Sequence, residues 1–140
     1  MIAVDTSVLV DYLGDGPYTR NAEEALRSAL SFGPVVACEV VVSEVVAGLG
    51  HGSGVMETLD AVGIRFSPLD QRAAVRAGEM QRRYKERLQR DPDVRLSKRS
   101  IPDFLIGAHA LLQCQALITR DGGFFRDYFK GLKVIVPQAA

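Results

Sequence analysis

Ile2-Ala3-Val4-Asp5-Thr6-Ser7 is a short apolar run that ends abruptly in an acidic residue and two hydroxyl residues. An unbroken apolar run of this length predicts a buried strand, and Asp5 can cap a helix that follows it. Similar runs predict strands at 35–37, 117–119 and 134–136, and a possible strand at 64–66.

The stretches between these runs have apolar residues at helical spacing. They predict helices over residues 8–13, 18–32, 39–47, 55–62, 70–89, 102–115 and 124–129. The valine-rich segment 39–47 would suit a strand equally well. A glycine-rich break is expected at 48–54 and a charged loop at 90–100. Short unbroken strands that alternate with helices predict an α/β fold, with a mainly parallel sheet of four to five strands flanked by helices.

Length and composition fit a single domain that spans residues 1–140. Hydrophobic residues make up 47% of the chain, which is enough for one core. No stretch approaches the ~18 apolar residues of a membrane helix, and the apolar opening lacks the basic residues of a secretory signal. We therefore expect a cytoplasmic protein without a membrane segment, in which Cys38 and Cys114 are reduced, buried thiols.

Four acidic residues lie next to predicted strands or at the start of a helix. Asp5 directly follows the first strand, and Glu44 lies on the helix after the second. Asp103 opens the helix that leads into the strand at 117–119, and Asp121 follows that strand. Ligands of open α/β sheets bind outside the carboxyl ends of the strands. The placement predicts that these four carboxylates point to the same end of the sheet.

Each of the four acids also has an ordinary structural role open to it. Asp5 could cap a helix, and Asp121 could be a turn residue before glycine. Asp103 matches the last position of a capping box, and Glu44 could face solvent. Four converging carboxylates, however, would repel one another and raise their pKa values unless a hard cation joined them. Taken together, the acids point to Mg²⁺ or Mn²⁺, which can activate a water and orient a phosphodiester.

Four segments in a fixed order resemble a known family. They are Val4-Asp5-Thr6-Ser7-Val8-Leu9, Val42-Ser43-Glu44-Val45, Ile101-Pro102-Asp103-Phe104-Leu105-Ile106-Gly107-Ala108 and Leu117-Ile118-Thr119-Arg120-Asp121. The set resembles the PIN-domain nucleases and, more narrowly, the VapC toxins of bacterial and archaeal toxin–antitoxin pairs. The likeness runs from about Met1 to Val136. It implies a PIN-like three-layer sandwich.

The resemblance also implies an activity and partners. It implies a ribonuclease that hydrolyses RNA phosphodiesters by metal-bound water, with no covalent nucleophile. The ligands of Mg²⁺ or Mn²⁺ would be Asp5, Glu44, Asp103 and Asp121. Ser7 and Thr119 would orient these ligands. A homodimer and a VapB-like antitoxin that blocks the acidic groove are implied as well.

Basic residues are concentrated in the middle of the chain. Residues 65–100 hold eleven basic and five acidic residues, whereas the part before them holds two basic and nine acidic residues. The densest stretch, from Arg82 to Arg99, suits a rim that contacts phosphate, with Tyr84 available for stacking. A solvated helix face fits equally well and is supported by Glu79–Arg83, an acid–base pair at helical spacing.

Several other features favour ordinary roles. The glycine-rich break lacks the preceding strand and the Gly-Lys-Ser/Thr ending of a phosphate loop, so it is interpreted as a connector. His51 is expected in a loop, and His109 at the surface or packed within its helix. The aromatic run at 124–129 predicts core or interface, and Asp127 is expected to be an exposed helix residue.

Three classes of protein other than a ribonuclease share part of this pattern. A haloacid-dehalogenase-like phosphatase needs a second Asp where the chain has Ser7. A receiver domain needs paired acids after its first strand, an acceptor Asp after its third and a Lys after its fifth, and none of these is in place. A PIN-like RNA- or protein-binding module that has lost its chemistry remains the alternative, and metal titration would separate it from the enzyme.

Overall fold

One sheet of short parallel strands forms the centre of the computed structural model, which describes residues 1–91 and 98–138. Its order is β3-β2-β1-β4-β5. The strands are β1 (Ile2–Val4), β2 (Val35–Ala37), β3 (Ile64–Phe66), β4 (Ala116–Ile118) and β5 (Lys133–Ile135). The last two strands begin one residue earlier than predicted. Every residue of β2 and β4 is buried, as expected for a parallel sheet covered on both faces.

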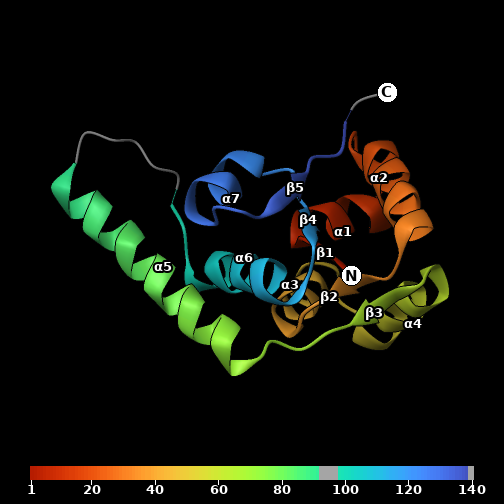
Figure 1. The fold of residues 1–140 in the computed structure, drawn as a ribbon. Coiled ribbons are helices and arrows are strands. Elements are labelled where there is room, and N and C mark those ends of the chain that lie inside the picture. The colour runs from red at the N-terminus through yellow and green to blue at the C-terminus, as the bar shows by residue number, and fades with distance from the viewer. Residues whose placement is uncertain (92–97, 139–140) are drawn as a thin grey trace.

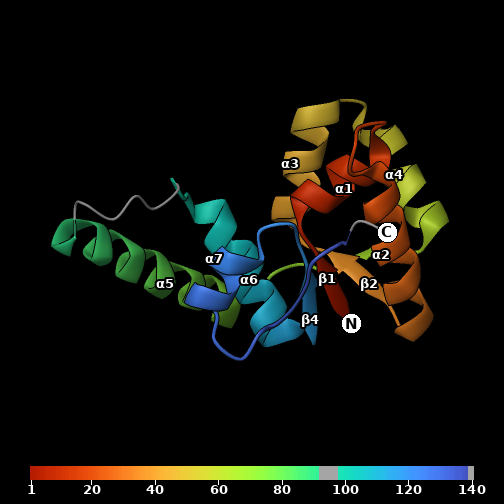
Figure 2. The same ribbon diagram turned by 90° about the horizontal axis from the view of Figure 1, so that it is seen from above.

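Helices cover both faces of the sheet. They are α1 (Thr6–Leu13), α2 (Thr19–Phe32), α3 (Glu39–Leu49), α4 (Gly52–Val62), α5 (Gln71–Arg90), α6 (Ile101–Gln113) and α7 (Gly122–Tyr128). The first four lie on one side of the sheet, and α5, α6 and α7 lie on the other (Figure 1 and Figure 2). Right-handed crossovers require this division, because the chain moves outward from β1 to β3 and then returns to β4. The predicted three-layer α/β sandwich is therefore confirmed.

The glycine-rich region is more helical than predicted. The valine-rich segment forms a helix that continues to Leu49, and α4 begins at Gly52, so the expected break at 48–54 shrinks to Gly50 and His51. These two residues have φ angles of 74° and 53°. Left-handed backbone turns the chain within very few residues, which explains why a longer connector is not needed.

Other boundaries differ slightly from the prediction. Helix α6 ends at Gln113, and α7 begins at Gly122, before the predicted 124–129. Arg90 belongs to α5. Most of the charged loop expected at 90–100 falls on residues 92–97, which lie outside the described residues.

An aromatic cluster joins α5, α6 and α7. It consists of Tyr84, Phe104, Phe124, Phe125, Tyr128 and Phe129. The centroids of contacting rings lie between 4.9 and 6.5 Å apart, in tilted or edge-to-face arrangements that aromatic pairs prefer. Residue 107 of α6 must be glycine here, because a Cβ atom would overlap the Phe129 ring. The prediction that the aromatic run belongs to the core is confirmed.

The cysteines and histidines occupy structural positions. Cys38 is buried, but Cys114 is only half-buried at the end of α6, in contrast to the prediction. His109 is packed within α6, with Nε2 3.2 Å from Ser67 Oγ, and burial lowers its pKa. His51 lies between two helices, as expected. In the described part of the chain, no helix is long and apolar enough to cross a membrane.

Candidate active site

A depression of about 500 Å³ lies at the carboxyl ends of β1 and β4. Its lining residues are Asp5, Thr6, Ser7, Glu44, Asp103, Arg120 and Asp121. We call it the acidic depression, because it brings together all four acids that the sequence singled out. The register that pairs Val4 with Ile118 places Asp5 beside Thr119, which is fully buried behind it. The catalytic and metal-binding roles of Asp5, Glu44, Asp103 and Asp121 stay a prediction.

Asp5 is buried, with 9% of its surface exposed, and is held by several hydrogen bonds. Its Oδ1 accepts from the Thr6 backbone N–H at 2.8 Å. Its Oδ2 accepts from Thr119 Oγ1 at 2.7 Å and from Ser7 Oγ at 3.4 Å. Burial raises the pKa of Asp5 to about 6; the bonds from Thr119 and Thr6 oppose that rise, and the charges of Asp103 and Glu44 add to it. A cation beside this carboxyl would favour its ionised form.

Glu44 and Asp103 face the depression from two different helices. Thr6 Oγ1 donates a hydrogen bond to Glu44 Oε1 at 2.7 Å. The Ser100 N–H donates to Asp103 Oδ2 at 3.2 Å, so Asp103 does complete the capping box of α6. This structural role leaves the second carboxylate oxygen of Asp103 available to a ligand, because a carboxylate has two acceptor atoms.

An arginine that the sequence did not place in the site binds Asp121. Arg99 Nη1 forms an ion pair with Asp121 Oδ2, and the guanidinium lies over the Phe124 ring at 4.2 Å. The Arg99 backbone N–H donates to the Tyr84 hydroxyl at 3.0 Å. The Arg99 side chain is 15% exposed and that of Asp121 is 41% exposed, so water screens this pair from the Asp121 side. The sequence grouped Arg99 with the basic stretch, and no spacing signal linked it to Asp121.

Arg120 supplies a second positive charge at the rim. Its Nε lies 2.7 Å from Asp11 Oδ2, and its guanidinium lies 4.4 Å from the centroid of the Tyr18 ring. These contacts fix the side chain against α1 and the turn that follows. The only sequence signal for Arg120 was its position directly before Asp121.

The donor set suits a hard divalent cation. Carboxylate and hydroxyl oxygens are the ligands that Mg²⁺ prefers, and a cation would relieve the repulsion that helps to raise the pKa of Asp5. Within residues 1–91 and 98–138, no group of three acidic, histidine or cysteine side chains is already placed to hold a metal ion. Mg²⁺ usually keeps several waters, so it needs few direct protein ligands.

A family model for the PIN domain matches residues 2–130 of the chain. The match extends from β1 through α7, so it includes every residue of the acidic depression. No curated protein sequence is similar enough to the chain to count as a match.

Solved structures with a similar fold come from toxin–antitoxin systems. A toxin–antitoxin complex from Klebsiella pneumoniae has a TM-score of 0.67 and 23% identity, covering 100% of both chains. VapBC2 from Rickettsia felis, bound to a DNA fragment from its promoter, has a TM-score of 0.70 and 17% identity, covering 99% of this chain and 100% of that one. VapC20 from Mycobacterium tuberculosis, described as a sarcin–ricin loop cleaving toxin, has a TM-score of 0.65 and 19% identity, covering 95% and 99%. At these identities the likeness shows a shared fold.

Proposed function

The chain belongs to the PIN domain family, and on that premise we propose that it is a metal-dependent ribonuclease with its active site in the acidic depression. The convergence of four carboxylates from separate helices and strand ends carries this proposal. Capping and turn roles alone would not require convergence, since each is satisfied locally. A buried carboxyl with a raised pKa beside two further acids costs stability, and such costs are typical of functional sites.

We further propose that this enzyme is the toxin of a type II toxin–antitoxin pair. The solved structures described above support this proposal, because they come from such systems and match nearly the whole chain. A VapB-like antitoxin, a homodimer and a cytoplasmic location belong to the same proposal, as does a single PIN domain over residues 1–140.

The depression offers a place for each part of phosphodiester hydrolysis. The residues that would hold Mg²⁺ or Mn²⁺ are Asp5, Glu44, Asp103 and Asp121. A divalent cation bound there supplies an activated water and neutralises charge that develops on the phosphate. Thr119 fixes the orientation of Asp5, and Thr6 fixes that of Glu44. Arg120 at the rim is placed to contact a phosphate oxygen.

The direct test is cleavage of total cellular RNA by the purified protein with Mg²⁺ or Mn²⁺. We expect cutting that stops in EDTA and in Asp103→Asn. Asp60→Asn is the matched control, because Asp60 is an exposed acid on α4 that does not line the depression. If well-folded protein cuts no RNA and binds no Mn²⁺ by calorimetry, the nuclease proposal fails and a binding module replaces it.

A further inference from the structure

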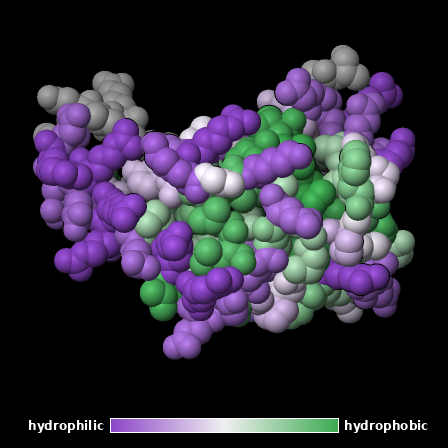
Figure 3. Space-filling model, viewed as in Figure 1, coloured by the Kyte–Doolittle hydropathy of each residue, from purple (hydrophilic) through white to green (hydrophobic). Residues whose placement is uncertain are grey.

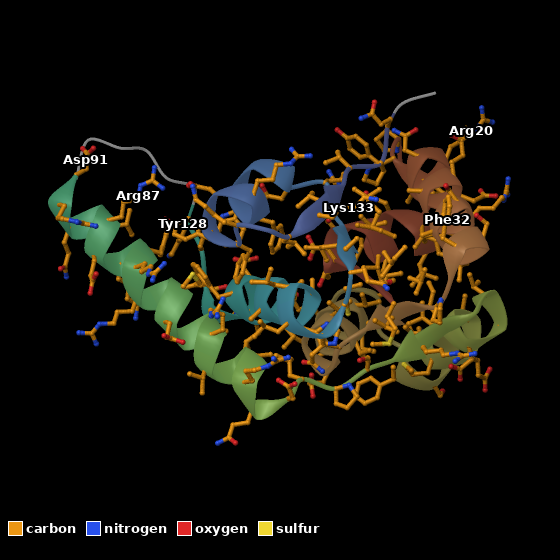
Figure 4. The ribbon with its side chains drawn as sticks, in the orientation of Figure 1. Arg20, Phe32, Arg87, Asp91, Tyr128 and Lys133 are labelled. Atoms are coloured by element: carbon orange, nitrogen blue, oxygen red, sulfur yellow. The ribbon has the colours of Figure 1, made fainter. Side chains whose placement is uncertain are left out.

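A groove of about 570 Å³ between α5 and α7 is lined by five basic, two acidic and four apolar or aromatic side chains. The basic residues are Arg76, Arg83, Arg87, Arg90 and Lys130, and the acidic ones are Glu86 and Asp127. We call it the basic groove. Figure 4 shows Arg87 of α5 and Tyr128 of α7 close together where the two helices meet.

The arginines of the basic groove follow one stripe along α5. Positions 76, 83, 87 and 90 recur at helical spacing, with Met80 between the first two. A helix rises about 1.5 Å per residue, so the stripe is roughly 21 Å long. Figure 3 shows hydrophilic side chains gathered over this helix. The groove is therefore an elongated positive track.

One cation of the groove forms an ion pair with an acidic side chain that also lines it. Arg87 Nη1 lies 2.7 Å from Asp127 Oδ2, and the hydrogen bond to Asp127 raises the pKa of Arg87. This pair ties α5 to α7, and Asp127 is exposed, as predicted. In the described part of the chain, no ion pair engages any of the other four basic residues of the groove.

The arrangement of charges along α5 differs from the prediction in one respect. The ion pair that the sequence suggested between Glu79 and Arg83 is not formed in the described part of the chain, where Arg82 pairs with Glu86 at 3.3 Å on the same helix. Among residues 1–91 and 98–138, no acidic side chain forms an ion pair with Arg83.

We propose that the basic groove binds the phosphate backbone of the RNA substrate, outside the acidic depression. The inference rests on the proposed function, since it assigns a second contact surface to the same substrate. A second copy of the chain would bring the same positive surface against itself, which disfavours a symmetric contact here. Met80, Leu111, Tyr128 and Phe129 also line the groove, but its arginines recur along the whole length of the stripe on α5, whereas a protein partner would favour charges confined to a rim around an apolar centre.

Two side chains connect the basic groove to the acidic depression. The ring of Tyr128 in the groove wall contacts that of Tyr84, with centroids 6.0 Å apart. The Tyr84 hydroxyl accepts the Arg99 N–H, and Arg99 pairs with Asp121. These contacts link the wall of the basic groove to Asp121 of the acidic depression through the buried Tyr84.

The test measures binding of a labelled single-stranded RNA to the full chain in EDTA, over a series of salt concentrations. Arg83→Gln/Arg90→Gln should weaken binding several-fold. It should also lower the slope of log affinity against log salt by about 1.4, because each phosphate contact on a single strand contributes about 0.7. Arg82→Gln is the matched control: it lies on the same helix with 83% of its side chain exposed and does not line the groove. Its affinity and slope should stay unchanged.

The outcomes separate this inference from the proposed function. If the wild type cuts RNA with Mn²⁺ but the double variant binds RNA with unchanged affinity and slope, the groove proposal fails and the nuclease proposal stands. If RNA binding depends on the groove while the wild type never cuts, the groove proposal stands and the nuclease proposal fails. Unchanged RNA binding with lost antitoxin binding would assign the groove to a protein and overturn the proposal.

Discussion

The acidic depression and the aromatic cluster share helix α6, yet their side chains are satisfied to very different degrees. In the cluster, each ring packs against at least one other, and Gly107 lets the helix fit against Phe129. In the depression, carboxylates face one another, and burial raises the pKa of Asp5. The aromatic cluster therefore stabilises the fold, whereas the acidic depression is held in place at the expense of stability.

Asp5→Asn should have the largest effect, which is a loss of activity in the acidic depression. A metal site contributes several kcal/mol to catalysis, and a loss of about 4 kcal/mol corresponds to roughly 10³-fold in rate. Single-turnover RNA cleavage with Mn²⁺ measures the effect, and Asp60→Asn should cut at the wild-type rate. Cleavage by Asp5→Asn at the wild-type rate would show that the depression is not the catalytic centre.

In the metal-free protein, the contribution of Asp5 to stability should fall as the pH rises from about 4 to about 7. The pKa of Asp5 is about 6 in the folded protein, against 3.8 ordinarily. Between these values the unfolded chain releases a proton that the folded protein keeps, so this contribution is present at low pH and lost as the pH passes 6. The loss is on the order of 2–3 kcal/mol.

Urea unfolding in EDTA across that pH range measures this effect. Asp5→Asn should lack the loss, because its side chain does not ionise. The same pH dependence in the variant and the wild type would mean that Asp5 is not the group responsible.

Gly107→Ala should affect the aromatic cluster, by lowering the free energy of unfolding rather than the rate of cleavage. The added methyl group overlaps the buried Phe129 ring, and overpacking of this kind costs about 1–3 kcal/mol. Gly78→Ala is the matched control, because nothing lies within 4 Å of a Cβ atom at this position of α5. It should be neutral or stabilise the helix by up to about 1 kcal/mol. Equal unfolding midpoints for the two variants would refute the close-packing argument.

Arg99→Gln should produce the smallest effect, and it changes a residue that contacts both the aromatic cluster and the acidic depression. Arg99 stacks on the cluster through Phe124 and neutralises Asp121 in the depression. Removing its charge should tighten Mn²⁺ binding a few-fold, corresponding to about 1 kcal/mol at partly screened distances. Calorimetric titration beside Arg82→Gln measures the change. Weaker Mn²⁺ binding would mean that Arg99 supports the site instead of competing with the ion.

The fold could be predicted because its strands are apolar runs buried on both faces. The convergence of Asp5 and Asp121 at one edge of the sheet follows from the same reasoning, since parallel strands end together. Asp103 shows the limit of such reasoning, because it lines the depression and also completes a capping box. Its pattern alone could not separate the two roles.

The features that the sequence did not reveal depend on contacts between distant segments. Arg99 reaches Asp121 only because the chain before α6 lies against α7. The boundary between α3 and α4 was set by the left-handed conformation of His51, which periodicity does not report. The basic groove likewise requires α5 and α7 to lie side by side.

The rate of single-turnover cleavage of a defined RNA, measured while Mn²⁺ is titrated from zero, tests the central claim most directly. If the acidic depression is a metal-dependent nuclease site, no cleavage should occur without the ion. The rate should rise to saturation with Mn²⁺, and Asp103→Asn should show no comparable rise. A rate that is independent of Mn²⁺, or equal in Asp103→Asn and the wild type, would contradict it.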